Sequence, residues 1–132
     1  MLKVKICDER METNCQKLID KSEENWNLAM DLCSDGQYNA AANRFYYSIF
    51  QVVKVYAIKK GKMKLEDRKG VHGIAKDLVK SEDKKLGRIY GDAENYRATA
   101  DYLLEDVSKN NLDSTFINDV QTLRDHYKKA CA

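Results

Sequence analysis

The sequence predicts an all-α protein: an antiparallel four-helix up-and-down bundle with one additional short helix. Its 132 residues include no proline and only six glycines, too few turn-forming residues for a protein of many short strands. Apolar residues recur at steps of three and four over four long segments, which is the period of a helix. Short polar connections join these segments, so we expect residues 1–132 to form a single helical domain.

The first long helix is expected over residues 12–32. Residues 1–11 are expected to form a flexible or accessory N-terminal segment, in which the alternating apolar residues over 2–6 are also consistent with a short strand. A Ser-Asp-Gly sequence follows the helix. Its last residue, Gly36, is suited to the left-handed conformation that ends many helices.

The second helix is expected over residues 38–60, where a broad apolar stripe indicates burial against two neighbouring helices. Gly61 ends this helix. Residues 62–73 read as a polar connection, and residues 74–80 as the additional short helix.

The third long helix is expected to start at residues 81–83 and to extend to about Ser108. Gly87 and Gly91 lie inside it, although glycine costs about 1 kcal/mol relative to alanine in a helix. The pair therefore suggests that another backbone or a ligand approaches closely. After a break, Asp113 or the serine that follows it caps the last helix.

Composition limits the classes of protein that the sequence by itself indicates. The net charge of +2 is too small to indicate a nucleic-acid binder. The four cysteines form no C-x-x-C pair and have no histidine at zinc-finger spacing, so we expect neither a metal site nor a disulfide framework, and no cofactor motif is found. No apolar run reaches the ~20 residues that span a bilayer, and the N-terminus lacks a secretory signal. We therefore expect a cytoplasmic protein without membrane contact.

The basic run over residues 59–69 has two interpretations. It is either a solvated connector or a rim that contacts phosphate.

Two arginines, Arg44 and Arg97, lie within helical segments among aromatic and small residues. An arginine beside an apolar helix face is costly to desolvate unless it is paired, and Asp101 lies one turn after Arg97. These residues form either an interhelical salt-bridge network or a cleft for a ligand or RNA, because half-buried arginines suit phosphate recognition. The candidate ligand-binding residues are Asn43, Arg44, Tyr47, Arg97, Asp101 and Tyr102.

The two histidines are weaker candidates. His72 lies in the connection near Arg68, with no evident partner to orient it, and a loop or capping role is the simplest interpretation. His126 lies in a charged stretch that begins at Arg124 and is expected at the surface. The catalytic candidates are therefore Arg97, Asp101 and His72, and each of them is weak.

Residues 35–50, DGQYNAAANRFYYSIF, resemble the G-x-Y-x-x-A-x-N-R-x-Y-Y-x-x-F signature of HEPN-domain proteins. Further blocks follow in the family's order. The LVK of residues 78–80, the LGRI of residues 86–89 and the R-x-x-x-D-Y of residues 97–102 are similar to its F-V-K, L-G-R-I and R-x-x-x-D-Y blocks. The resemblance covers about residues 15 to 130.

This resemblance implies an all-α bundle that is often a homodimer. It also implies binding of nucleotide, and a minimal nucleotidyltransferase as partner in toxin–antitoxin or related defence modules. Many relatives are metal-independent RNases whose active site is an arginine followed, after four to six residues, by a histidine. In such a site the arginine stabilises the charge on the phosphate, while the histidine moves the proton of the ribose 2′-hydroxyl.

The chain departs from that catalytic pattern. No arginine is followed by histidine at the required spacing: only three residues separate Arg68 from His72, and Arg97 is followed by Asp101, whose carboxylate repels phosphate. We therefore expect a non-catalytic module that binds a nucleotide or RNA phosphate, or a nucleotidyltransferase partner. The alternatives are an RNase toxin with a degenerate site and a purely structural or interaction bundle.

Overall fold

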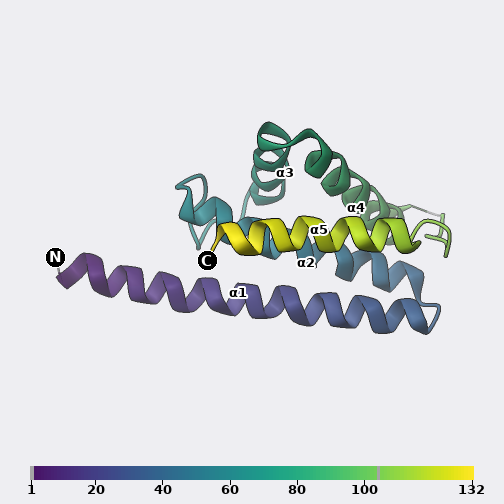
Figure 1. Cartoon of the computed structure of the whole chain (residues 1–132), viewed down its shortest axis with the longest axis horizontal. Coiled ribbons are helices and arrows are strands. Elements are labelled where there is room, and N and C mark those ends of the chain that lie inside the picture. Colours follow the sequence, from purple (N-terminus) through teal and green to yellow (C-terminus); the bar gives the residue numbers. More distant parts are fainter. Residues whose placement is uncertain (1, 104) are drawn as a thin grey trace.

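The computed structural model describes the backbone of residues 2–103 and 105–132, and side chains from residue 9 onward within those ranges. Secondary structure in this part of the chain is entirely helical, which confirms the predicted all-α class. The helices are α1 (Leu2–Ser34), α2 (Tyr38–Lys59), α3 (Val71–Glu82), α4 (Lys84–Tyr102) and α5 (Ser114–Ala130) (Figure 1).

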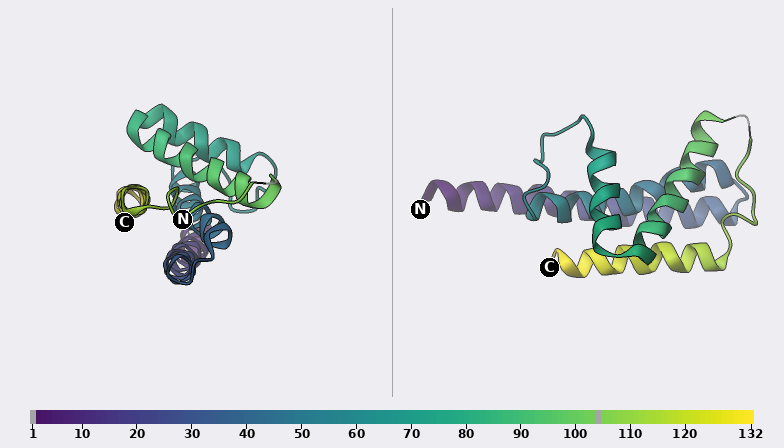
Figure 2. Two further views of the ribbon diagram at one scale, coloured as in Figure 1. Left: turned by 90° about the vertical axis from the view of Figure 1, so that its right-hand side faces the viewer. Right: turned by 90° about the horizontal axis from the view of Figure 1, so that it is seen from above.

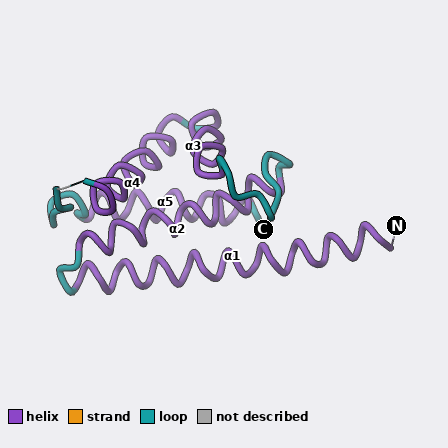
Figure 3. The backbone as a smooth tube through the Cα atoms, turned by 180° about the vertical axis from the view of Figure 1, so that it is seen from behind, coloured by secondary structure: helices purple, strands orange, loops and turns teal. Residues whose placement is uncertain are grey.

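The second helix, α2, is the centre of the fold and packs against every other helix. The four long helices α1, α2, α4 and α5 alternate in direction, and the short α3 crosses them steeply (Figures 1 and 3). Seen along the long axis, α1 lies on one side of α2, the α3–α4 pair on the opposite side, and α5 beside them (Figure 2). Side chains on almost every side of α2 are therefore covered.

The core follows from this arrangement. Its largest fully buried side chains come from the apolar stripe of α2 and from α4 and α5, as the periodicity of the sequence predicts. They include Phe45, Tyr46, Ile49, Ile89, Tyr90, Leu123 and Tyr127.

The first helix is longer than predicted. It begins at Leu2 instead of Glu12, and residues 2–6 are helical instead of forming a strand. The sequence has no proline or glycine before Gly36, so nothing interrupts the helix once it has formed. Met1 and the side chains of residues 2–8 lie outside the described part of the chain, and an accessory role for this segment stays a prediction.

The fourth helix is shorter than predicted, because it ends at Tyr102 instead of near Ser108. Asn39 at the start of α2 holds the chain that follows: its Oδ1 accepts a hydrogen bond from the Val107 backbone N–H at 2.8 Å, and its Nδ2 donates to Asp106 at 2.9 Å. Val107 is buried as the helical pattern suggested, but it reaches the core from a loop.

The predicted start of α4 and the predicted cap of α5 are confirmed. The side chain of Asp83 accepts a hydrogen bond from the Leu86 backbone N–H at 3.0 Å, and that of Asp113 accepts one from the Phe116 N–H at 2.9 Å. Each aspartate satisfies a backbone donor that has no partner within its helix.

Arg124, which the sequence placed in an exposed stretch, is instead buried, with 6% of its surface accessible. Its guanidinium joins α5 to α1: it donates to Ser22 Oγ at 3.3 Å and to Glu23 Oε2 at 2.9 Å, and its carbon lies 5.3 Å from the Trp26 ring centroid. The hydrogen bond from Arg124 lowers the pKa of Glu23. His126 is exposed, as expected.

The basic run over residues 59–69 is engaged with the protein at its start. Lys59 donates to the Cys131 carbonyl at 2.6 Å and pairs with Glu12 at 3.3 Å, and Lys60 lies over the Tyr56 ring at 5.4 Å. These contacts hold only the start of the run to the protein, and the choice between a solvated connector and a rim that contacts phosphate stays a prediction.

The close approach suggested for the two glycines of α4 exists at one of them. A Cβ on Gly87 would lie 3.0 Å from the Lys80 Cα, because α3 packs against α4 at this point, whereas a Cβ on Gly91 would meet no atom within 4 Å. Gly87 therefore permits the α3–α4 packing and Gly91 does not serve this purpose.

We predict that Gly87→Ala and Gly91→Ala change stability in opposite directions. Gly91→Ala should raise the free energy of unfolding by up to about 1 kcal/mol, because alanine favours the helix. Gly87→Ala should lower it by about 1–2 kcal/mol, because the backbone of Lys80 must move. Urea unfolding followed by circular dichroism measures both, and equal gains from the two variants would contradict the close approach.

Candidate functional site

Arg97, in the last turns of α4, faces α2 and is held by three hydrogen bonds. Its Nη2 donates to Tyr47 Oη at 3.1 Å and to Tyr102 Oη at 3.2 Å, and its Nε donates to Asp101 Oδ2 at 3.1 Å. About 19% of the Arg97 side chain is accessible to solvent. The guanidinium is thus fixed at the edge of the core and still open on one side.

Aromatic rings surround the same guanidinium. Its carbon lies 5.4 Å from the ring centroid of Tyr46, 5.5 Å from that of Tyr47 and 5.3 Å from that of Tyr102, distances at which ring faces attract a cation. Burial opposes the charge, but the neighbouring Tyr47, Tyr102 and Asp101 outweigh it and raise the pKa of Arg97 above its ordinary value. The guanidinium therefore keeps its positive charge.

Asp101 connects α4 to α2. Its Oδ2 accepts a hydrogen bond from Asn43 Nδ2 at 3.0 Å in addition to the one from Arg97, and 28% of the aspartate side chain is accessible. Asp101 thus orients Arg97, as the four-residue spacing predicts. The structure brings together Asn43, Tyr47, Arg97, Asp101 and Tyr102, which we call the Arg97 cluster.

Arg44 does not join this cluster. It is exposed, and its Nη1 donates at 3.3 Å to Asn25 on α1, whose amide in turn donates to Gln51 at 2.9 Å. Adjacent helix residues point about 100° apart, so Asn43 and Arg44 face different neighbours of α2. The two arginine stretches of the sequence therefore do not form one pocket.

His72 lies near the cluster, although the sequence offered no partner for it. It is the second residue of α3, its ring stacks on Phe50 with centroids 4.2 Å apart, and its Nδ1 is 2.6 Å from Tyr46 Oη. The Tyr46 and Tyr47 rings that contact Arg97 also contact His72, at centroid distances of 5.7 and 6.1 Å. Only the packing of α3 on α2 creates these contacts.

A chain of hydroxyl groups determines the tautomer of His72. Tyr46 Oη is also 3.3 Å from Tyr90 Oη, and both tyrosines are fully buried. If Tyr90 donates to Tyr46, and Tyr46 to His72 Nδ1, every proton in the chain has an acceptor, whereas the reverse order leaves the buried Tyr90 proton without one. The neutral ring then carries its proton on Nε2.

His72 is neutral near pH 7. Burial and the charge of Arg97 lower the pKa of its ring below the ordinary value of 6.5. Glu94 opposes this effect, but its carboxylate is engaged by Lys76 at 2.8 Å. Burial also raises the pKa of Tyr46 to about 12, so its hydroxyl keeps the proton that it donates.

Within the described residues, no group of three or more His, Cys, Asp or Glu side chains is arranged to hold a metal ion. Among the described residues, no helix is both long enough and apolar enough to cross a membrane.

Comparison with known proteins links the chain to one family. The family described as HEPN domain matches residues 15–130, a range that contains the Arg97 cluster and His72. A protein of Methanocaldococcus jannaschii named "Putative toxin MJ0142" is 33% identical over 104 residues, which cover 76% of this chain and 70% of that protein.

We predict that His72 makes folding stability depend on pH. A histidine whose pKa is lowered by folding binds its proton more readily when unfolded, so its contribution is complete above 6.5 and is lost as the pH falls from 6.5 toward the folded pKa. Urea unfolding between pH 5 and 7.5 should show this loss, and the His72→Phe variant should show a smaller slope.

An NMR titration gives the direct check on the same prediction. The His72 ring signal, assigned by its absence from the His72→Phe variant, should have a midpoint below 6.5. A midpoint above that value would contradict the environment described for the ring.

Proposed function

The chain belongs to the HEPN-domain family, and from that premise we propose that it is a helical module of a toxin–antitoxin-type system that binds an RNA or nucleotide phosphate at Arg97 without cleaving it. The observation that carries this proposal is the fixed and half-open guanidinium of the Arg97 cluster. A preorganised arginine loses less conformational entropy when it binds a ligand.

Unused donors support the proposal. Of the five N–H groups of a guanidinium, those on Nε and Nη2 serve Asp101, Tyr47 and Tyr102, and Nη1 makes no hydrogen bond to the described residues. Two N–H groups on Nη1 thus remain for phosphate oxygens. The exposed ring of Tyr102, 70% accessible, offers a surface on which a base can stack.

The charges nearby favour binding over catalysis. Asp101 compensates part of the charge of Arg97, so the guanidinium stabilises the additional negative charge of a cleavage transition state less than an unpaired arginine does. The neutral His72 carries its proton on Nε2 and therefore acts as a hydrogen-bond donor, whereas cleavage through the 2′-hydroxyl needs a base that accepts a proton.

A metal-independent RNase remains the second candidate function, because His72 and Arg97 contact the same two tyrosine rings. In such a reaction a base removes the 2′-hydroxyl proton and the 2′-oxygen bonds to phosphorus. The 5′-oxygen leaves with the electron pair of the broken bond and takes up a proton. In this site Asp101 would have to be the base, or His72 in its other tautomer.

A protein partner is part of the proposal. The name of the M. jannaschii relative describes it as a toxin, and a cell that makes a toxin of its own survives only if something neutralises it. We propose a nucleotidyltransferase-type protein for that role and a homodimer as the state of this chain. Leu103, 59% accessible beside the cluster, is an exposed apolar residue that an interface would cover.

We predict that Arg97→Ala weakens binding of RNA at least tenfold, because a charge-assisted hydrogen bond to phosphate contributes about 1.5–3 kcal/mol. The measurement is an NMR titration of the folded protein with a short oligouridylate. Arg44→Ala is the matched control, since it also removes one positive charge, but from the side of α2 that faces α1. The Arg44→Ala variant should bind RNA as the wild type does. Equal losses from both variants would contradict a site at Arg97.

We also predict that the purified protein leaves a mixed RNA pool intact in the presence of a chelator. Gel analysis of the pool after incubation measures this. Cleavage that disappears in Arg97→Ala and in His72→Ala would establish the RNase instead, and the non-catalytic proposal would then be wrong.

A further inference from the structure

A half-buried strip of α2 runs away from the Arg97 cluster between the neighbouring helices. Asn43, Tyr47, Phe50, Gln51 and Lys54 lie within about 120° of one another around the helix axis, since each residue turns the helix by about 100°. Towards one edge of the strip α2 meets α1, where Gln51 accepts a hydrogen bond from Asn25. Towards the other it meets α3 and α4, where Phe50 stacks on His72 and Tyr47 accepts from Arg97.

The strip leads to a basic hollow. About two turns after Tyr47, Lys54 faces a hollow of about 310 Å³ between α1, α2 and the connection before α3. Lys17 and Lys21 of α1 also line it, and its remaining lining residues are Asn14, Leu18 and Leu65. We call this hollow the lysine groove. Three lysines thus line a surface whose lining contains no carboxylate.

These lysines are not used by the fold. Within the described part of the chain, Lys17, Lys21 and Lys54 make no ion pair or hydrogen bond, whereas Lys59 and Lys76 are both paired. The nearby Asp20 accepts a hydrogen bond from Gln16 at 2.9 Å. Like charges one turn apart on a helix repel each other, so Lys17 and Lys21 cost some stability until an anion lies between them.

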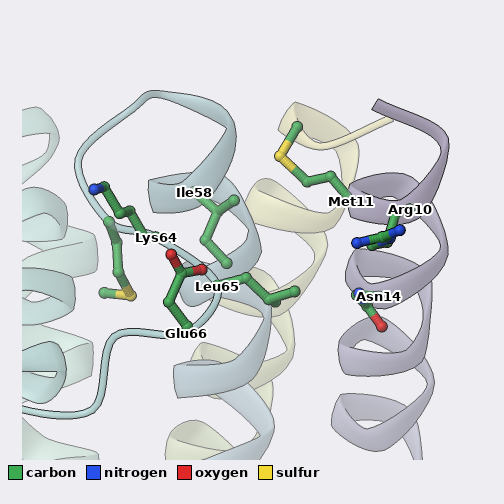
Figure 4. A pocket seen from close by; sticks show the side chains of 8 residues that line it. Arg10, Met11, Asn14, Ile58, Lys64, Leu65 and Glu66 are labelled. Atoms are coloured by element: carbon green, nitrogen blue, oxygen red, sulfur yellow. The ribbon is translucent and has the colours of Figure 1, made fainter. Parts of the chain in front are cut away.

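The lysine groove continues on its other side into an apolar hollow of about 370 Å³. The two hollows share Asn14 and Leu65, and Figure 4 shows Leu65 extending from the connection toward α1. Met11, Ile58 and Met63 supply apolar surface there, so the groove adjoins a place for a base as well as cations for phosphates.

The groove and the Arg97 cluster are close enough to act on one ligand. The His72 ring stacks on Phe50, one turn before Lys54, and also contacts the Tyr47 ring over which Arg97 lies. The seven residues from Tyr47 to Lys54 correspond to about 10 Å along α2. A stacked strand carries a phosphate about every 3.4 Å along its axis, so about four nucleotides cover this distance.

We propose that the lysine groove is a second phosphate-binding subsite, and that a single strand of RNA lies along α2 from the Arg97 cluster over His72 to Lys17, Lys21 and Lys54. This inference rests on the proposed function, because it extends the ligand at Arg97 from one phosphate to a strand. It names single-stranded RNA of at least four nucleotides as the ligand class.

The test compares a two-nucleotide with an eight-nucleotide oligouridylate, each titrated by NMR at several salt concentrations. In the variant Lys17→Gln/Lys21→Gln/Lys54→Gln, the octamer should bind about tenfold more weakly and the salt slope of its affinity should decrease by about 2, since each phosphate contact with a single strand contributes about 0.7. Binding of the dinucleotide should stay unchanged, because it reaches only the Arg97 cluster.

The matched control is Lys80→Gln/Lys84→Gln/Arg88→Gln, which removes three positive charges from another hollow, between α3 and α4. It should bind both oligonucleotides nearly as the wild type does. The lysine groove is not a subsite if the lysine variant keeps the octamer affinity and its salt slope. The same conclusion follows if that variant loses affinity for the dinucleotide and the octamer equally, or if the control variant loses as much octamer affinity. Circular dichroism establishes that each variant is folded.

Failure of the proposed function has a different signature. If Arg97→Ala binds the dinucleotide as the wild type does while the lysine variant loses the octamer, the groove stands and the site at Arg97 is wrong. If the wild-type protein binds neither oligonucleotide, both proposals are wrong.

Discussion

The burial of Tyr46 at the centre of α2 is the interaction on which both the fold and the candidate site depend. Its ring contacts His72 of α3, Tyr90 of α4 and the guanidinium of Arg97, so one side chain joins three helices. A buried hydroxyl is costly unless it is hydrogen-bonded, and Tyr46 meets this condition only with Tyr90 and His72 in place. The same hydrogen bonds therefore hold α3 and α4 against α2 and determine which nitrogen of His72 carries the proton.

Two arginines of this protein, Arg97 and Arg124, are largely removed from solvent, and each needs partners that compensate its charge. Arg124 is almost fully buried, and Ser22, Glu23 and Trp26 surround it, so its charge serves the contact between α5 and α1. Arg97 is equally well oriented, but 19% of its side chain is accessible to solvent, against 7% for that of Arg124. The interpretation as an interhelical salt-bridge network thus applies to Arg124, whereas for Arg97 we propose the interpretation as a binding cleft.

Local patterns predicted what depends on neighbours in the sequence. Periodicity located the helices, and the four-residue spacing found the pair of Arg97 and Asp101. Two errors arose where a distant residue contributes: Asn39 binds the chain at Val107, where the sequence predicted that the helix continues, and α1 pairs with Arg124. Tyr46 gives His72 a partner 26 residues away, and no spacing rule anticipates such a contact.

The contact between Arg124 and Ser22 has a consequence for the order in which the chain folds. Most helix pairs here are neighbours in sequence, so α1–α2 and α3–α4 close short loops that cost little chain entropy. The hydrogen bonds from Arg124 to Ser22 instead join residues 102 positions apart. By contact order alone, the hairpins α1–α2 and α3–α4 form first, and α5 docks onto α1 in a later step.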